Sequence, residues 1–314
     1  MSILLNLLFT FCFSWIEFNG IQTLNSPDYR DTLPYHKITI NDIGLPKTHY
    51  PYPVIKHKTL SLQYSKSHKQ PIWVAYELLS SHLNGSISRL NKFKNDPEIG
   101  LDINFDKNYS RSGFDRGHLV PAADMKWSVI SMDESFYYSN VSPQYPSFNR
   151  GIWKVLEDKV REWATLNDRL YINIGPVFGD ENHVMGIDRI NIPDAFYKVI
   201  LDYTNPDVKA IAFYIPHIQS NESIDKYAIS VDSLEKIIGV DFFSNLPDNQ
   251  EEIIERELCL KCWFDQPSLS HSKSQNSDDE VRLDDSKLNK IIHLGPKGGR
   301  YYINSKGNKV YLKK

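Results

Sequence analysis

Two side chains in the segment 112–118, Ser-Gly-Phe-Asp-Arg-Gly-His, and a third some thirty positions later suit the hydrolysis of a phosphodiester. The His118 imidazole can accept a proton from water near neutral pH without binding a metal. Arg116 can neutralise charge on the phosphate oxygens. The side-chain oxygen of Asn149 is a neutral ligand for a hydrated cation. Together these groups could cleave a phosphodiester with one metal ion.

A helix expected over residues 149–166 would position part of this chemistry. Its polar ridge carries Asn149, Glu157 and Arg161; Glu157 and Arg161 are one turn apart, and Asn149 lies two turns before Glu157. The three could face one pocket, beside a histidine at a strand end and a second strand expected at 136–141. Two simpler interpretations stay open: Asn149 as a helix N-cap, and Glu157 with Arg161 as a surface ion pair.

Apolar runs and helical spacing predict the rest of the scaffold. The expected strands cover residues 60–64, 72–78, 170–174, 196–203 and 210–215, and the expected helices cover 149–166 and 250–263. The break at 67–70 is typical of a hairpin loop. These elements predict an α+β fold in which helices pack on the faces of a central, mainly antiparallel sheet.

Charge is distributed unevenly along the 314 residues, although the formal net charge is only −3. Residues 286–314 carry eight Lys or Arg and no Asp or Glu, which leaves 28 basic against 39 acidic residues in the remainder. An acidic body argues against a broad electrostatic footprint for DNA. Any nucleic-acid contact must therefore come from a local cluster of basic residues or from the tail.

The composition predicts five segments: a leader (1–20), an extended lead-in (21–55), a main domain (56–264), a flexible Ser/Asp-rich linker (265–288) and a small basic module (289–314). The leader has the length of a signal-peptide core, which favours export. No basic residue precedes its apolar run and no small-residue cleavage site follows, so an uncleaved membrane anchor is the alternative. A mitochondrial presequence fits poorly, because Arg30 is the first arginine.

Three cysteines occur in the chain, and Cys12 lies in the leader. The other two, Cys259 and Cys262, form the motif Cys-Leu-Lys-Cys. If the leader is removed, their even number permits a disulfide in an oxidising compartment. The motif is only half of a zinc site, because no second cysteine pair is present.

Several ordered blocks carry a family resemblance. They are Ser112–Leu119, Pro121–Asp124, Lys126–Ser128, Phe136–Gln144, Asn149–Glu157, Ile174–Phe178, Val231–Glu235 and Asp241–Phe243. These blocks resemble the DNA/RNA non-specific endonuclease family, which includes the mitochondrial endonuclease G type and secreted bacterial nucleases. The resemblance covers about residues 56–263.

The resemblance implies a ββα-metal, or His-Me finger, active site. By motif, His118 would be the general base and Asn149 the only direct protein ligand of Mg²⁺, for which Mn²⁺ can substitute. Glu157 would hold water of the ion's hydration shell. A single neutral ligand leaves the charge of the ion available to the scissile phosphate and the leaving oxygen.

The remaining family positions concern charge and support. Arg116 and Arg161 match positions that the family uses for phosphate or transition-state charge, and Arg89 aligns with an upstream family arginine. Asn140 is expected to support the geometry of the site, and Asp115 to orient its loop.

The resemblance predicts a metal-dependent, sugar-non-specific endonuclease acting on DNA and RNA. The alternative is a catalytically silent nucleic-acid-binding protein that keeps the fold. A homodimer is a further expectation, since endonuclease G relatives are often dimers.

The basic module 289–314 resembles short adaptor modules of large algal viruses. It is expected to form a β-hairpin of two short strands around an Asn-Ser-Lys-Gly turn. Basic residues interleaved with tyrosines could hold nucleic acid, and protein or cell-wall docking is equally open, so its partner is undetermined.

Overall fold

The structure is a computed structural model that describes residues 43–181, 183–204, 208–265, 293–294, 300–303 and 309–311. The chain divides into two compact units, residues 1–266 and 267–314. The expected leader (1–20) and all of the expected linker after Asp265 lie outside the described residues. Among the helices of the described part, none is long and apolar enough to cross a membrane.

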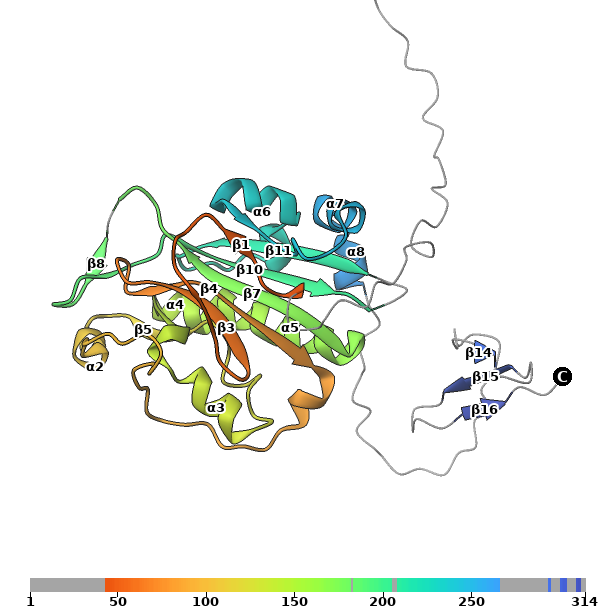
Figure 1. Cartoon of the computed structure of the whole chain (residues 1–314), viewed down its shortest axis with the longest axis horizontal. Coiled ribbons are helices and arrows are strands. Elements are labelled where there is room, and N and C mark those ends of the chain that lie inside the picture. Colours follow the sequence, from red (N-terminus) through yellow and green to blue (C-terminus); the bar gives the residue numbers. More distant parts are fainter. Residues whose placement is uncertain are drawn as a thin grey trace, which may run out of the picture. The chain divides into compact units, whose positions relative to one another are not determined.

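A seven-stranded sheet forms the centre of the larger unit (Figure 1), and every neighbouring pair of its strands is antiparallel. In spatial order the strands are β12 (Ala228–Ile229), β11 (Lys209–Pro216), β10 (Ala195–Asp202), β7 (Arg169–Val177), β4 (Gln70–Leu79), β3 (Leu60–Ser65) and β2 (Val54–Lys56). Strand β10 is buried along its whole length, because both faces of the sheet are covered. The predicted α+β class with an antiparallel sheet is confirmed.

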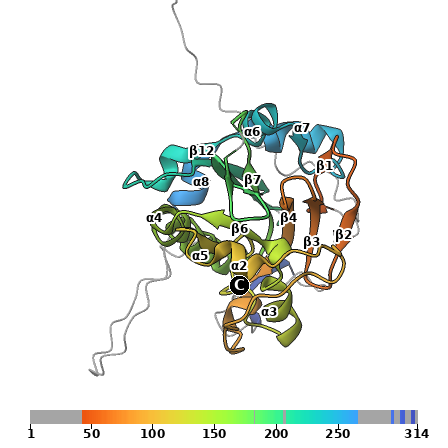
Figure 2. The ribbon, with the colours of Figure 1, turned by 90° about the vertical axis from the view of Figure 1, so that its left-hand side faces the viewer.

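Helices cover the two faces of the sheet from opposite sides (Figures 1 and 2). Helix α5 (Lys154–Asn167) buries its apolar stripe in the core on one face. Helices α6 (Val231–Ile238) and α7 (Asp248–Arg256) pack on the other face. Side chains of β10 alternate between the two cores, as the period of a strand requires: Phe196 faces the α5 side and Tyr197 the α6 side.

Regular structure begins earlier than the sequence predicted. Strand β1 (Lys47–Thr48) pairs with β13 (Val240–Asp241), and β2 starts at Val54. Ile43 is already buried in the core of the α6 side. Part of the segment expected as an extended lead-in thus forms strands, and such short strands with few apolar residues give little sequence signal.

The single helix expected over residues 250–263 is also wrong. Helix α7 ends at Arg256, where Glu257 adopts an extended conformation, and α8 (Leu260–Phe264) follows. Cys259 precedes α8 and forms a disulfide with Cys262. The disulfide that the cysteine count permitted is present in the structure.

A hairpin and a helix form the ββα unit that carries the candidate site. Strand β5 (Asp115–His118) pairs antiparallel with β6 (Val141–Gln144). Gly117 allows this close pairing, because a Cβ there would lie 2.2 Å from the side chain of Gln144. The strand predicted at 136–141 was placed too early, since a 3₁₀ turn, η3 (Tyr138–Asn140), precedes β6.

Shorter elements complete the described chain. They are η2 (Ser80–Asn84), α2 (Phe105–Tyr109), α3 (Val129–Ser135), α4 (Pro146–Phe148), the π-helical turn η4 (Asn149–Trp153), β8 (Val184–Met185), β9 (Ile190–Asn191) and η5 (Ile224–Tyr227). In the small C-terminal unit, β15 (Arg300–Ile303) pairs antiparallel with β16 (Lys309–Tyr311), as the expected hairpin requires. A third strand, β14 (His293–Leu294), pairs with β15.

Candidate active site

One pocket of about 450 Å³ lies where the β5–β6 hairpin meets the start of α5. It brings together six residues that the sequence singled out: Arg89, Arg116, His118, Asn149, Glu157 and Arg161. Arg150, Lys154 and Asp158 also line it. The expectation that the polar ridge of the helix and the histidine face one pocket is therefore met. Asn140 and Asp115 support the pocket from outside its lining.

His118 is the last residue of β5 and is only 8% exposed. The rings of Phe93 and Phe136 lie against its imidazole, with centroid distances of 5.0 Å and 4.9 Å. This burial, and secondarily the charge of Arg89, lowers the pKa of His118 to about 3. Its Nε2 atom has no hydrogen-bond partner within the described chain. The imidazole is thus neutral at physiological pH, and its Nε2 atom is not engaged by another residue of the described chain.

Asn140 fixes the backbone that follows His118. Its side chain accepts a hydrogen bond from the Val120 N–H (2.9 Å) and donates to the carbonyls of Val120 (3.0 Å) and Ser135 (2.9 Å). Its own carbonyl accepts from the Leu119 N–H at 2.9 Å. Asn140 is completely buried, so it does not touch a ligand in the pocket and acts through the chain it holds.

The Asn149 amide is oriented by Asp115. Asn149 Nδ2 donates to Asp115 Oδ2 at 2.9 Å, and the Arg150 guanidinium donates to both oxygens of the same carboxylate, at 2.9 Å and 2.7 Å. Because the amide nitrogen is engaged, the carbonyl oxygen Oδ1 is the group that remains for a cation. A neutral oxygen ligand in a pocket with the Glu157 carboxylate fits a hydrated Mg²⁺.

The simpler interpretations of this helix are not supported. Asn149 has helical backbone angles (φ −57°, ψ −47°) and follows α4, so it is not an N-cap. The chain bends two residues later, at Gly151, before α5 begins. Arg161 forms ion pairs with Asp124 (2.8 Å) and with Asp158, and Glu157 is not its hydrogen-bonded partner.

Glu157 lines the pocket, and its side chain is partly buried. Burial raises its pKa, and the charge of Lys198 opposes this effect. Lys198 comes from β10, is fully buried, and its Nζ lies 4.8 Å from the centre of the Trp153 ring without a hydrogen-bond partner. The same burial lowers the pKa of Lys198. The pair places an acid and a base at the junction of α5 and the sheet.

The arginines of the pocket are held to different degrees. Arg116 donates from Nε to the Tyr138 hydroxyl (3.0 Å) and from a terminal nitrogen to Asp106 (3.0 Å). Arg161 is anchored by its two aspartates. Arg89 is exposed, and its guanidinium lies 5.3 Å from the centre of the Phe136 ring. Two cations are therefore positioned by neighbours, and the third keeps more freedom to meet a ligand.

Sequence reasoning missed Lys198 and the role of Asp124. Asp124 is buried, accepts from the Tyr76 hydroxyl at 2.6 Å and pairs with Arg161. A signal for Lys198 existed, because it is the one charged residue inside the apolar run 195–201 of β10. A lysine in such a strand requires a buried partner.

Comparison with known proteins agrees with this geometry. The sequence profile of the DNA/RNA non-specific endonuclease family matches residues 39–249. The mitochondrial nuclease EXOG of Danio rerio is 32% identical over 243 residues, which span 71% of this chain and 71% of that protein. A nuclease of Nostoc sp. is 32% identical over 219 residues, which span 66% of this chain and 78% of the relative.

A solved structure of endonuclease G in complex with EndoGI shows the same fold. It superposes with a TM-score of 0.58 at 27% identity and covers 63% of this chain and 88% of the other. The predicted ββα-metal nuclease fold is confirmed, and the alternative of a catalytically silent protein receives no support from these relatives. On the family match and the shared fold, the chain belongs to the DNA/RNA non-specific endonuclease family and is a nuclease.

Proposed function

We propose that the protein hydrolyses internal phosphodiester bonds of both DNA and RNA at the pocket of His118 and Asn149, with one Mg²⁺ or Mn²⁺ ion. The observation that carries the proposal is that two groups occur together. The His118 imidazole is neutral and its Nε2 has no partner within the described chain, and the Asn149 amide has its nitrogen engaged and its oxygen left for a cation. Both face one cavity lined by arginines.

The residues of the chain divide the reaction among them. His118 takes a proton from water, and the resulting hydroxide attacks phosphorus while the bond from phosphorus to the leaving oxygen breaks. Arg116 and Arg161 stabilise the negative charge that grows on the phosphate oxygens. When bound, the cation supplies Lewis-acid stabilisation of the phosphate and of the leaving oxygen. Asn149 would be its protein ligand.

Several groups hold this arrangement in place. Asp115 fixes which end of the Asn149 amide faces the pocket, and Asn140 fixes the strand end that carries His118. Glu157, which lines the cavity, would orient water there. Arg89, the exposed arginine, would bind the phosphate chain of the substrate as it enters.

The ends of the chain bear on location and assembly. Relatives named as mitochondrial nucleases support an N-terminal targeting segment. The composition of residues 1–20 favours export over mitochondrial import, with a membrane anchor as the alternative. A homodimer and nucleic-acid binding by the C-terminal module belong to the same proposal.

The proposal is tested with purified protein on plasmid DNA and on RNA. We expect cleavage of both in Mg²⁺ or Mn²⁺, none in EDTA, and recovery when Mg²⁺ is restored. His118→Ala should lower kcat/KM at least about a hundredfold, the usual scale for loss of a general base. His183→Ala, which removes an exposed imidazole, is the matched control.

Two outcomes would contradict the mechanism. Full activity of the wild type in excess chelator would exclude the cation, and near-normal turnover by folded His118→Ala would exclude the base. Cleavage of DNA with no cleavage of RNA would leave the mechanism intact and correct the substrate range.

A further inference from the structure

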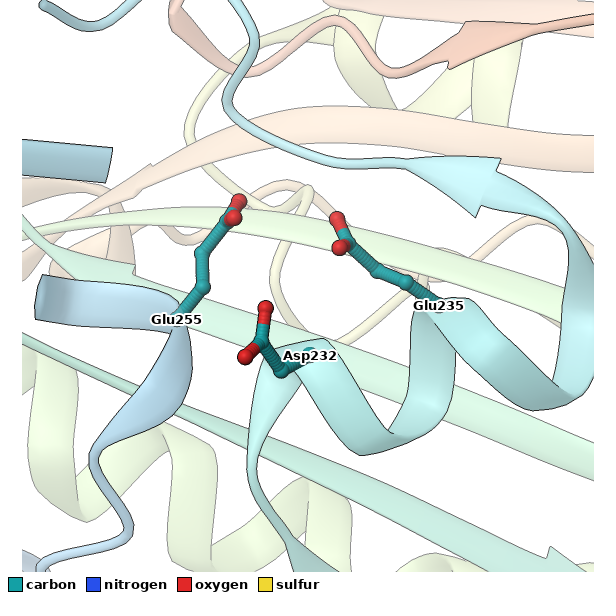
Figure 3. Close-up of side chains that lie close together, drawn as sticks. All are labelled: Asp232, Glu235 and Glu255. Atoms are coloured by element: carbon teal, nitrogen blue, oxygen red, sulfur yellow. The ribbon is translucent and has the colours of Figure 1, made fainter. Parts of the chain in front are cut away.

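Three carboxylates converge on the sheet face that α6 and α7 cover, opposite the face covered by α5 (Figure 3). Asp232 and Glu235 come from α6, and Glu255 comes from α7. One oxygen of each lies within 4.8 Å of the others. Oxygens bound to one Ca²⁺ lie about 2.4 Å from the ion and at most ~4.8 Å from each other, so small side-chain rotations would let the three share one ion.

The environment of Glu255 shows that the carboxylate cluster lacks a positively charged partner within the described chain. The residue is only 5% exposed, its Oε1 atom has no hydrogen-bond partner, and its carboxyl group points toward Asp232 and Glu235 (Figure 3). Glu235 uses Oε1 to accept from the Phe242 N–H at 2.6 Å. Within the described chain, no lysine, arginine or histidine forms an ion pair with any of the three carboxylates.

Neighbouring charges increase the need for a cation. Burial raises the pKa of Glu255 to about 9, and the charges of Glu235, Glu251, Asp241 and Asp232 add to this rise. Buried carboxylates at this spacing repel each other unless a proton or a cation lies between them. Among the described residues, Lys47 lowers the pKa of the neighbouring Glu251 but forms no ion pair with the three carboxylates, and one backbone N–H, that of Phe242, donates to Glu235.

The donor set selects the cation. Carboxylate oxygens are ligands of hard cations, and the cluster supplies no sulfur or imidazole nitrogen for zinc. Ca²⁺ accepts several carboxylates in flexible geometry, whereas Mg²⁺ demands a near-ideal octahedron and keeps more of its waters. Asp232 and Glu235 are only partly buried, so water can complete the shell.

We propose that Asp232, Glu235 and Glu255 form a calcium site that ties α7 to α6. The ion would be coordinated by carboxylates of both helices, and this coordination would replace the repulsion between those carboxylates. It would thereby stabilise the end of the nuclease domain, at a distance from the chemistry of the His118 pocket and independently of it.

The experiment uses the full-length protein and Ca²⁺ as the probe. Equilibrium dialysis should find one Ca²⁺ fewer per chain in Glu255→Gln than in the wild type. Saturating Ca²⁺ should raise the wild-type Tm over that in EGTA by roughly 3–10 °C, the range expected for a site with a Kd of ~0.1–1 mM. Glu252→Gln, an exposed glutamate on the same helix, should keep both the ion and the shift.

The proposed nuclease mechanism also places a divalent cation at Asn149, so the measurements are repeated in Asn149→Ala. The Ca²⁺-dependent rise in Tm should persist there and disappear in Asn149→Ala/Glu255→Gln. Equal Tm values in Ca²⁺ and EGTA for the wild type would overturn the proposal. The repulsion between the three carboxylates would then be relieved by bound protons instead of a cation. Should Glu255→Gln fail to fold, Asp232→Asn takes its place with the same expected loss. Cleavage in Mg²⁺ should be unchanged in Glu255→Gln, which separates this test from that of the nuclease mechanism.

Discussion

The environment of His118 couples its protonation to folding. The native imidazole stays neutral because burial lowers its pKa to about 3, whereas an exposed histidine in the unfolded chain titrates near 6.5. Between these values the unfolded state binds the extra proton, so the free energy of unfolding falls as the pH falls from about 6.5 toward 3. Above pH 6.5 the histidine has no such effect.

His118→Gln should therefore make stability less sensitive to acid. Between pH 6.5 and 3, the free energy of unfolding of the wild type should fall more steeply than that of the variant, by up to ~1.4 kcal/mol per pH unit. Denaturant titrations at several pH values measure both slopes, and the exposed His183→Gln serves as the control. Parallel slopes would mean that the native pKa of His118 is not lowered and that its protonation is not coupled to folding.

Asp115 offers a test of how Asn149 is held. Asp115→Asn weakens the contacts to Asn149 and Arg150, which frees the Asn149 amide to rotate. Loss of a group that orients a metal ligand typically costs ten- to a hundredfold in metal affinity. We expect the Mg²⁺ concentration for half-maximal cleavage to rise by that factor, with activity recovered at high Mg²⁺. Asp133→Asn, which breaks only an exposed pair with Lys94, should leave the metal dependence unchanged.

At the scale of elements, Lys198 joins strand β10 to helix α5. Its ammonium is fully buried, and Glu157 is the strongest charge that favours its protonation. Lys198→Met would leave Arg161 as the remaining positive charge that acts on Glu157, and removal of one partner of a buried pair typically costs about 3–5 kcal/mol. Lys198→Met/Glu157→Gln should regain much of that loss. A double-mutant cycle in denaturant decides this, and strictly additive effects would show that the two groups are not coupled.

An element could be predicted from the sequence when its own residues form a clear pattern. Strands β4, β7, β10 and β11 were predicted because they are long apolar runs between turn residues. The strand predicted at 136–141 was misplaced. Its aromatic residues are buried, but they lie at the end of α3 and in the 3₁₀ turn η3, not in a strand. Helices α7 and α8 share one apolar period, and only the three residues 257–259, the first of them in an extended conformation, separate them.

The site was predictable where a short motif carries it. His118, Arg116 and Asn149 lie in motifs whose residue types already indicate the chemistry. The apolar run around Lys198 marks the lysine as unusual, but its proximity to Glu157 could not be predicted, since that depends on the antiparallel pairing of β10 with β7, which places the strand beneath α5. Contacts between distant segments carry no local pattern.

At the scale of the whole molecule, the chain joins a catalytic unit to a small C-terminal unit with a different charge. The first unit holds the complete candidate pocket. Residues 286–314 hold eight basic residues and no acidic ones. Basic residues that neutralise phosphates give binding that weakens steeply with salt and does not depend on sequence. The two units are therefore expected to contribute separately, one to cleavage and one to retention.

Deletion of residues 286–314 tests this division. Cleavage of a short duplex at low salt should stay near the wild-type kcat/KM, because all pocket residues remain. Binding to long DNA should weaken, and its dependence on log salt should become shallower by ~0.9 for each phosphate contact that is lost. A full-length variant with the eight basic residues changed to glutamine controls for chain length and should behave like the deletion. If the deletion abolishes cleavage of the short duplex, the tail is part of the catalytic unit. If neither quantity changes, the partner of the module is a molecule other than DNA, because its charge would then have no effect on DNA binding.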